Sequence, residues 1–339
     1  MKPLRLAVLA ATFALLAVLF AACGEKAEDT TGGETESLSL ALDFYPNPDH
    51  AGVYMAEELG YYEEAGLDVK IEAPTDPSLP IKQVAAGRTD VAISYEPEVV
   101  LAHEQGLDVV AIGAVVNEPL TSMIWLAKSG IKGVPDLKGK TIAYAGIPYQ
   151  EAFLKTILAR GGLTPDEVKA VNVGFNLQPA LVGGSADATL GGFRNVEGVE
   201  LRERGLKPVV TPVDRLGVPT YDELVLVANR EALEAEPEKY RLFIAALERG
   251  TDAAVAQPAA ATQAILAANP SLEPKLTKAE VEATLPLLGA RVEGKPYGYM
   301  DPASWDAFAG WMRDNELIAS LPTAAELLTN DYLPGEIPE

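Results

Sequence analysis

Residues 38–72 read LSLALDFYPNPDHAGVYMAEELGYYEEAGLDVKIE and predict a strand, a loop, a helix and a second strand. Apolar residues alternate over 38–43, which is the pattern of a β-strand. A helical pattern follows over 52–59, and residues 67–72 alternate again. Strands that alternate with helices at this spacing build a mostly parallel sheet with helices on its faces. We therefore expect an α/β fold.

The pattern continues along the chain in two units. The first unit has further strands at 91–94, 109–115 and 122–127, and a second, smaller α/β unit begins at 141. Residues 221–228 form an apolar strand that is suited to crossing back, and the remainder is largely helical. Two crossings between two units predict two lobes with a cleft at a hinge. We expect one lobe to comprise 38–126 plus 224–339 and the other 127–223.

The N-terminal run MKPLRLAVLAATFALLAVLFAAC (1–23) has the order of an export signal, with Lys2 and Arg5 before an apolar stretch. Small residues precede Cys23, and this ending resembles a bacterial lipobox. We expect residues 1–22 to be a lipoprotein signal peptide, Cys23 to be lipidated and 23–37 to be a flexible tether. The alternatives are an ordinary secretory signal with an incidental cysteine and an uncleaved anchor. The expected location is the extracytoplasmic face of a bacterial cell membrane, or the periplasm.

Composition excludes several classes of function. The chain has 27 Lys plus Arg against 49 Asp plus Glu, a net charge of −22, so nucleic acid is not an expected partner. Cys23 is the only cysteine, which excludes disulfides and thiol catalysis in the exported body. The chain has only two histidines, His50 and His103, so a metal or catalytic site built mainly from histidines is not expected. We expect no metal, no cofactor and no enzymatic activity.

Polar and aromatic residues gather where the predicted strands end, which is where ligands sit in α/β sheets. The candidate ligand-binding residues are Asp43, Tyr45, Asn47, His50, Tyr95, Glu96, Tyr149, Glu151, Asn195, Glu197 and Tyr221. Aromatic faces can sandwich a planar ring, and a carboxylate can accept from an aminopyrimidine's amino group or protonated ring nitrogen. Because Arg194 is the only nearby cation, this mixture favours a neutral or cationic heteroaromatic ligand over an anion.

Several of these residues have a structural alternative. Asp43 could instead cap the following turn, and Tyr45 and Tyr95 could be half-buried packing. His50 could bond to backbone near the start of a helix. Glu197 and Glu200 share one face of a predicted helix, and we expect Glu197 to reach the cleft.

Fragments spread over 38–333 resemble one family. They are 42–56 (LDFYPNPDHAGVYMA), 60–62 with 64–69, 85–93 (AAGRTDVAI), 137–141 and 328–333. They resemble periplasmic solute-binding proteins of the thiamine-pyrimidine and sulfonate (nitrate/taurine) group. The resemblance implies a type II periplasmic-binding-protein fold, a monomer, and an ABC permease and ATPase as partners. The loop after 42 and residues 191–200 look more like the branch that binds thiamine-pyrimidine precursors of the hydroxymethyl- or formylaminopyrimidine type.

Other functions remain open at this point. Within transport, the alternatives are riboflavin or an alkanesulfonate as ligand. An enzyme similar to a pyrimidine synthase is a further alternative, but the resemblance implies that such an enzyme needs a cysteine-rich segment, and the only cysteine here is Cys23. A sensory or structural surface lipoprotein is the third class.

Overall fold

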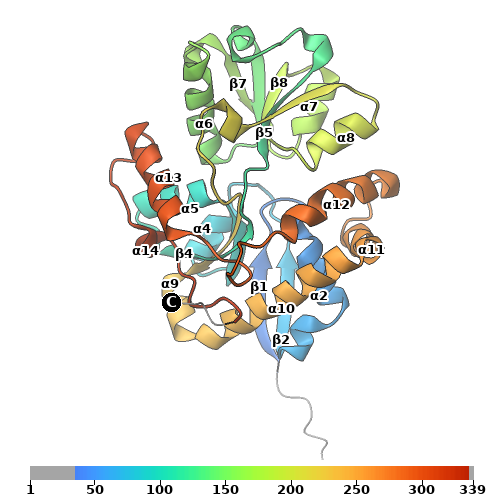
Figure 1. Cartoon of the computed structure of the whole chain (residues 1–339), viewed down its shortest axis with the longest axis vertical. Helices are drawn as coiled ribbons and strands as arrows, with labels where there is room; N and C mark the ends of the chain where they lie inside the picture. The colour runs from blue at the N-terminus through green and yellow to red at the C-terminus, as the bar shows by residue number, and fades with distance from the viewer. Residues whose placement is uncertain (1–34, 336–339) are drawn as a thin grey trace, which may run out of the picture. The chain divides into compact units, whose positions relative to one another are not determined.

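The computed structural model describes residues 35–335, and from Glu36 onward these residues form one compact unit. This unit contains two five-stranded sheets, each covered by helices, and the sheets form two lobes (Figure 1). Cys23, the predicted signal peptide and nearly all of the predicted tether lie outside the described residues. Within the described range, no helix is both long and apolar enough to cross a membrane.

The first sheet has the strand order β2-β1-β3-β10-β4. β1 pairs in parallel with β2 and β3, whereas β10 is antiparallel to both β3 and β4. The strands are β1 (Glu36–Ala41), β2 (Leu67–Glu72), β3 (Val91–Ser94), β4 (Val109–Val116) and β10 (Leu224–Asn229). Every residue of β3 and β4 is buried, which explains their continuous apolar runs.

The second sheet repeats this arrangement with the order β7-β6-β8-β5-β9. β6 is parallel to β7 and β8, and β5 is antiparallel to β8 and β9. The strands are β5 (Thr121–Leu126), β6 (Thr141–Tyr144), β7 (Lys169–Asn172), β8 (Ala188–Phe193) and β9 (Pro208–Pro212). Each sheet therefore receives one antiparallel strand, β10 or β5, directly from the crossing segment between the lobes.

This topology corrects one expectation. Residues 121–126 are expected at the end of the first lobe (38–126), but β5 is hydrogen-bonded within the second sheet. The first crossing thus lies between β4 and β5, at residues 117–120. β9 was not predicted, since it is a short, partly exposed edge strand with a proline at each end.

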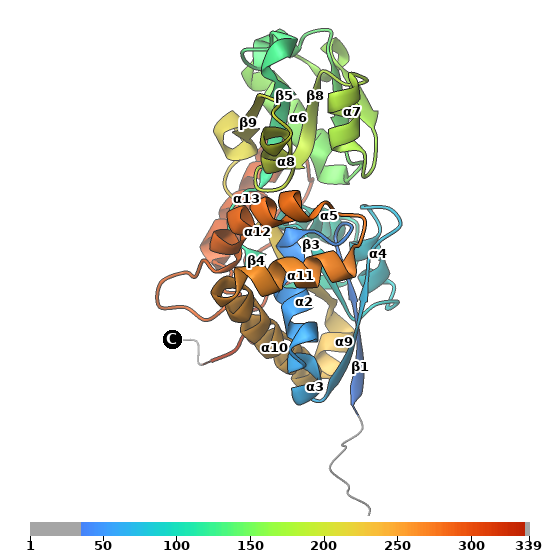
Figure 2. The same cartoon turned by 90° about the vertical axis from the view of Figure 1, so that its right-hand side faces the viewer.

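Helices surround both sheets (Figures 1 and 2). They are α2 (Ala51–Glu58), α3 (Tyr61–Glu64), α4 (Pro80–Ala85), α5 (Glu96–Glu104), α6 (Pro148–Arg160), α7 (Leu177–Gly183), α8 (Glu197–Glu203), α9 (Arg230–Ala235), α10 (Pro237–Ala256), α11 (Pro258–Ala268), α12 (Pro274–Leu288), α13 (Pro302–Asp314) and α14 (Ala324–Leu327). Short 3-10 turns complete the chain: η1 (Pro48–His50), η2 (Ala127–Ser129), η3 (Val134–Leu137), η4 (Pro165–Glu167) and η5 (Val213–Leu216).

A buried carboxylate ties the two crossing segments together. Glu223, which precedes β10, accepts hydrogen bonds from the backbone N–H groups of Leu120 and Thr121 at 2.6 and 2.7 Å. The hydroxyls of Thr121 and Tyr221 also donate to it, at 2.7 and 2.9 Å. With four donors on one fully buried carboxylate, the two segments are held side by side at the hinge.

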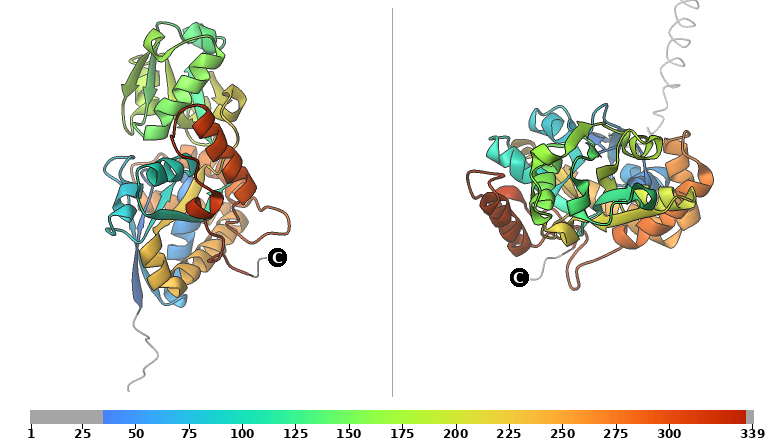
Figure 3. Two further views of the ribbon diagram at one scale, coloured as in Figure 1. Left: turned by 90° about the vertical axis from the view of Figure 1, so that its left-hand side faces the viewer. Right: turned by 90° about the horizontal axis from the view of Figure 1, so that it is seen from above.

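The lobes also meet on both sides of the hinge. On one side, α8 of the second lobe contacts α12, as Figure 2 shows. On the other, Phe153 of α6 packs its ring against Phe308 and Trp311 of α13, with centroids 6.5 and 6.0 Å apart. In the left view of Figure 3, the red ribbon of α13 reaches up to the green ribbon of the second lobe. The space between the lobes is therefore bounded by packed helices on two flanks.

Candidate functional site

A narrow pocket of about 20 Å³ lies between the lobes, which is where small-molecule sites occur in two-lobed proteins. The first lobe contributes the loop after β1 and the end of β3, and the second lobe contributes the ends of β6 and β8 with the starts of α6, α7 and α8. The lining residues are Asp43, Phe44, Tyr45, Asn47, Tyr95, Ala145, Ile147, Tyr149, Gln150, Leu177, Gly191, Phe193, Val196 and Glu197.

Asp43 is the acidic group of the first lobe, and its carboxylate is held by two neighbours. Nε2 of His50 donates to Oδ1 and the Tyr95 hydroxyl donates to Oδ2, both at 2.8 Å. The backbone N–H of Asn47 donates to Nδ1 of His50 at 3.2 Å, so Nδ1 carries no proton and the neutral ring keeps its proton on Nε2. The two donors fix the orientation of Asp43 and leave its negative charge unneutralised.

Glu197 is the acidic group of the second lobe. It begins α8, and its Oε2 accepts the backbone N–H of Phe193 at 2.7 Å. Burial raises the pKa of Glu197 to about 7, although the backbone hydrogen bond favours the ionised form. Near neutral pH this carboxyl group can therefore either accept or donate a hydrogen bond.

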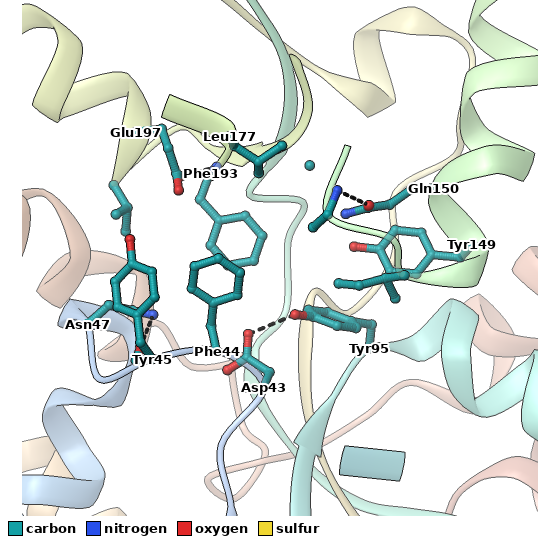
Figure 4. Close-up of a pocket in the computed structure, with 14 residues that line it drawn as sticks. Asp43, Phe44, Tyr45, Asn47, Tyr95, Tyr149, Gln150, Leu177, Phe193 and Glu197 are labelled. Carbon is teal, nitrogen blue, oxygen red and sulfur yellow. Dashed lines mark hydrogen bonds between the residues drawn. The ribbon is translucent and has the colours of Figure 1, made fainter. Parts of the chain in front are cut away.

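Aromatic rings form the walls of the pocket. The Phe44 ring lies 4.5 Å from that of Tyr45 and 4.6 Å from that of Phe175, and Tyr95 lies 5.3 Å from Tyr149, all between centroids. In Figure 4, Tyr45 and Glu197 stand on one side and Tyr95, Tyr149 and Gln150 on the other, with the rings of Phe44 and Phe193 pointing toward one another between them. A flat ligand would meet aromatic surface on several sides.

Gly191 has a specific steric role. Its φ of +104° disfavours other residues, and a Cβ there would lie 2.3 Å from Nε2 of Gln150. Gln150 in turn accepts the backbone N–H of Ala145 at 2.9 Å. The glycine thus gives the Gln150 amide its place in the wall.

The structure brings many of the predicted residues together. Asp43, Tyr45, Asn47, Tyr95, Tyr149 and Glu197 all line the pocket. Among them, Asn47 also accepts the Asp49 backbone N–H at the start of η1. Asp43 does not cap the following turn, since its side-chain partners are His50 and Tyr95 rather than a helix N-terminus.

The other predicted residues do not line the pocket. His50 lies behind Asp43 with both ring nitrogens engaged. Glu96 accepts the Asp222 backbone N–H at 2.7 Å near the hinge, and Glu151 is exposed and accepts the Tyr144 hydroxyl at 2.6 Å.

Asn195 and Tyr221 are also outside the lining. Asn195 is buried and bonds to the first lobe. Tyr221 is buried between Phe153 and Phe308, with centroids 5.5 and 5.4 Å from theirs. Both side chains make contacts with residues far away in the sequence, and a local sequence pattern does not reveal such contacts.

Sequence reasoning did not select Phe44, Gln150 or Phe193. Phe44 and Gln150 adjoin predicted site residues, and Phe193 is the last residue of β8, so their positions at strand and helix ends were the available signal. Phe44 and Phe193 were not predicted because apolar aromatic residues at strand ends have the same pattern as core residues.

The ionisable side chains Asp43 and Glu197 give the pocket lining its acidic character. Among the described residues around this pocket there are two carboxylates and no lysine, arginine or histidine. Within 35–335, no group of three or more His, Cys, Asp and Glu side chains is placed to hold a metal ion. The pocket therefore offers acceptors and aromatic faces to a ligand.

The chain matches a protein family and is similar to several known proteins. Residues 47–261 match the family described as NMT1/THI5 like. The formylaminopyrimidine-binding protein of Halalkalibacterium halodurans is 35% identical over 315 residues, covering 92% of this chain and 95% of that protein. The 4-amino-5-hydroxymethyl-2-methylpyrimidine phosphate synthase of Aspergillus parasiticus is 32% identical, covering 67% of this chain and 69% of that enzyme.

A solved structure shows the fold. The alkanesulfonate-binding protein SsuA of Xanthomonas axonopodis pv. citri, bound to MOPS, aligns with a TM-score of 0.68 at 17% identity, covering 88% of this chain and 99% of that one. The expected α/β fold of periplasmic binding proteins is thereby confirmed. With its match over residues 47–261 and relatives above 30% identity, the chain belongs to the NMT1/THI5-like family.

Proposed function

We propose that the protein is the extracytoplasmic solute-binding lipoprotein of an ABC importer and captures a thiamine pyrimidine precursor by closing its lobes. One observation carries this proposal. Asp43 and Glu197, from opposite lobes, line an aromatic pocket that has no cationic side chain among its described residues. The ligand class is a 4-aminopyrimidine of the hydroxymethyl or formylamino type.

The chemistry of an aminopyrimidine suits these two carboxylates. Its exocyclic amino group has two donors, and a protonated ring nitrogen supplies a third that carries charge. Asp43 already accepts one hydrogen bond on each oxygen, and each oxygen has a further lone pair. Charge-assisted contacts of this kind are about twice as strong as neutral ones. The name of the Halalkalibacterium halodurans relative supports the same ligand class.

The pocket disfavours an alkanesulfonate. A sulfonate is a permanent anion and needs donors or cations around its oxygens. Here it would face the Asp43 carboxylate and Glu197 with no cation among the described lining residues. The likeness to a sulfonate-binding protein therefore supports the fold and not the ligand.

A second candidate is a pyrimidine synthase, because the Aspergillus parasiticus relative carries that name. Two observations favour binding over turnover. The His50 ring is fully buried behind Asp43 with both nitrogens occupied, so it presents no free nitrogen to the pocket. Residues 24–339 also contain no cysteine.

The location and partners form part of the same proposal. The lipobox-like ending at Cys23 and the polar stretch after it support a lipid-anchored body on the outer face of the cell membrane. An ABC permease and its ATPase would then receive the ligand from the open lobes. We propose that the protein acts as a monomer.

Isothermal titration calorimetry of the purified protein tests the ligand. The panel is 4-amino-5-hydroxymethyl-2-methylpyrimidine, its formylaminomethyl counterpart, riboflavin and taurine. We expect both pyrimidines to bind, taurine not to bind, and chromatography to recover the pyrimidines unaltered. Binding of taurine or of riboflavin alone would replace the ligand class, and a new pyrimidine product would favour the synthase.

A further inference from the structure

A groove opens directly beside the pocket, between α8 of the second lobe and α11 and α12 of the first. Its volume is about 620 Å³, and it shares Tyr45, Asn47, Val196 and Glu197 with the pocket. Because these residues border both spaces, a ligand whose ring occupies the pocket can extend a substituent into the groove.

Carboxylates from both lobes line or adjoin this groove. Glu197 and Glu200 come from α8, Glu280 from α12, and Asp49 from η1 lies close enough to act on Glu280 electrostatically. Arg204 is the cation among them, and it is already paired with Glu200 at 2.6 Å. Closing the lobes therefore brings several acidic groups close to one another, and the one arginine among them is already in an ion pair.

Glu280 is the exceptional member of this set. Its exposed fraction is 4%, it lines the groove, and within the described residues it has no hydrogen bond and no ion pair. Burial, and then the charges of Glu200, Glu197 and Asp49, raise the pKa of Glu280 to about 9, while Arg204 acts in the opposite direction. A carboxyl group that faces a cavity and has no partner in the protein is a place for a ligand.

The groove also has aromatic faces. Tyr45 and Phe175 line it, with ring centroids 6.1 Å apart. Carboxylates combined with aromatic faces favour organic cations, which gain from ion pairing and from the negative face of the ring. The described residues provide no geometry for a metal ion, so an organic cation fits this chemistry best.

We propose that the groove is a second subsite of the same binding site and takes a positively charged substituent of the ligand, with Glu280 as its counter-ion. This inference rests on the proposed function, since the ring in the pocket is the pyrimidine. It adds to the ligand class pyrimidines with an ammonium or similarly sized organic cation on the side arm. A proton on Glu280 leaves as the cation arrives.

Two matched probes test the subsite. They are 4-amino-2-methylpyrimidines with a 5-aminomethyl group, charged at neutral pH, or a neutral 5-hydroxymethyl group. At pH 7.5 we expect the aminomethyl probe to bind about tenfold tighter or better. Its binding should also release a proton, seen as a binding enthalpy that depends on the ionisation enthalpy of the buffer, and the release should exceed that of the hydroxymethyl probe.

A pair of variants assigns the effect to Glu280. Glu280→Gln should abolish both the preference for the aminomethyl probe and the extra proton release. Glu282→Gln is the control, because Glu282 is exposed on the same helix and faces Lys278 at 3.6 Å. Equal or weaker binding of the aminomethyl probe to the unmodified protein overturns the second subsite and leaves the pyrimidine function standing. Binding of neither probe overturns both, and these comparisons hold even if the variant does not fold.

Discussion

Nδ2 of Asn195 donates a 2.7 Å hydrogen bond to Oδ1 of Asp49 and so joins the second lobe to the first. The same nitrogen donates to Oγ1 of Thr284 on α12 at 2.8 Å. On the opposite flank, Glu98 of α5 accepts the backbone N–H of Tyr149 at 3.3 Å, at the start of α6. Neither Asn195 nor Glu98 lines the pocket. Hydrogen bonds between the lobes can thus set the degree of closure without touching a ligand.

Asn195→Ala should favour the open lobes. The change removes both hydrogen bonds and leaves buried polar groups without partners, which costs on the order of 1–3 kcal/mol in the closed form. We expect pyrimidine affinity to fall about tenfold and the radius of gyration from X-ray scattering to increase. Thr284→Val, which removes one of the two acceptors, should have a smaller effect. Unchanged affinity and scattering would show that this contact does not control closure.

Glu197→Gln should weaken pyrimidine binding by about 1.5–3 kcal/mol if the contact is charge-assisted. The glutamine keeps the size of the side chain and an oxygen to accept the Phe193 backbone N–H, so the start of α8 should persist. Glu151→Gln is the matched control, because Glu151 is exposed on α6 and does not line the pocket. Calorimetry with the hydroxymethylpyrimidine measures both. Equal affinities for the two variants would remove Glu197 from the site.

Sequence patterns predicted most of the strands because a buried strand has a recognisable run of apolar residues. The predicted limits 67–72 and 91–94 are those of β2 and β3. The same pattern does not show which of the two sheets a strand joins. All six residues of β5 are buried, so its composition is the same whether it ends one lobe or begins the other. Only its hydrogen bonds with β8 and β9 decide the matter.

Residues that line the pocket were predictable where a polar or aromatic side chain comes shortly after the end of a strand. Asp43 and Tyr95 follow β1 and β3, whose parallel pairing brings these ends to the same edge of the sheet. Tyr221 also stands beside a strand, but its ring enters the cluster of Phe153 and Phe308. Whether a polar or aromatic side chain faces the pocket or a neighbouring helix depends on packing between segments far apart in sequence. A local pattern does not contain that information.

Gly250→Ala should destabilise the fold. α10 and α2 approach closely there, and a Cβ on Gly250 would lie 2.3 Å from the Gly52 carbonyl oxygen and 2.6 Å from Cβ of Ala56. Overpacking of this kind costs about 1–3 kcal/mol, more than alanine's advantage in helix propensity recovers. Gly310→Ala in α13 is the control, because a Cβ there meets nothing within 4 Å. Thermal unfolding should show a lower midpoint for the first variant only; equal midpoints would contradict the close approach.

Several buried acids make stability depend on pH. Burial raises the pKa of Glu98, Glu197 and Glu223 to about 7 each, and that of Asp222 to about 6. Their ordinary values are 4.5 for Glu and 3.8 for Asp. Between these values and the raised ones, the folded chain holds more protons than the unfolded chain. The free energy of unfolding therefore falls as pH rises through this window.

The ligand-free protein should accordingly melt at its highest temperature near the acid end of the window, about pH 5, and lose several degrees by about pH 8. The large negative net charge acts in the same direction, since added repulsion favours the expanded chain. Glu98→Gln should flatten the profile, because the amide keeps an acceptor for the Tyr149 backbone N–H and has no charge to bury. Differential scanning calorimetry at pH 5, 6, 7 and 8 measures both profiles. A midpoint that rises with pH, or a variant whose slope equals that of the parent, would contradict the assignment of these buried acids.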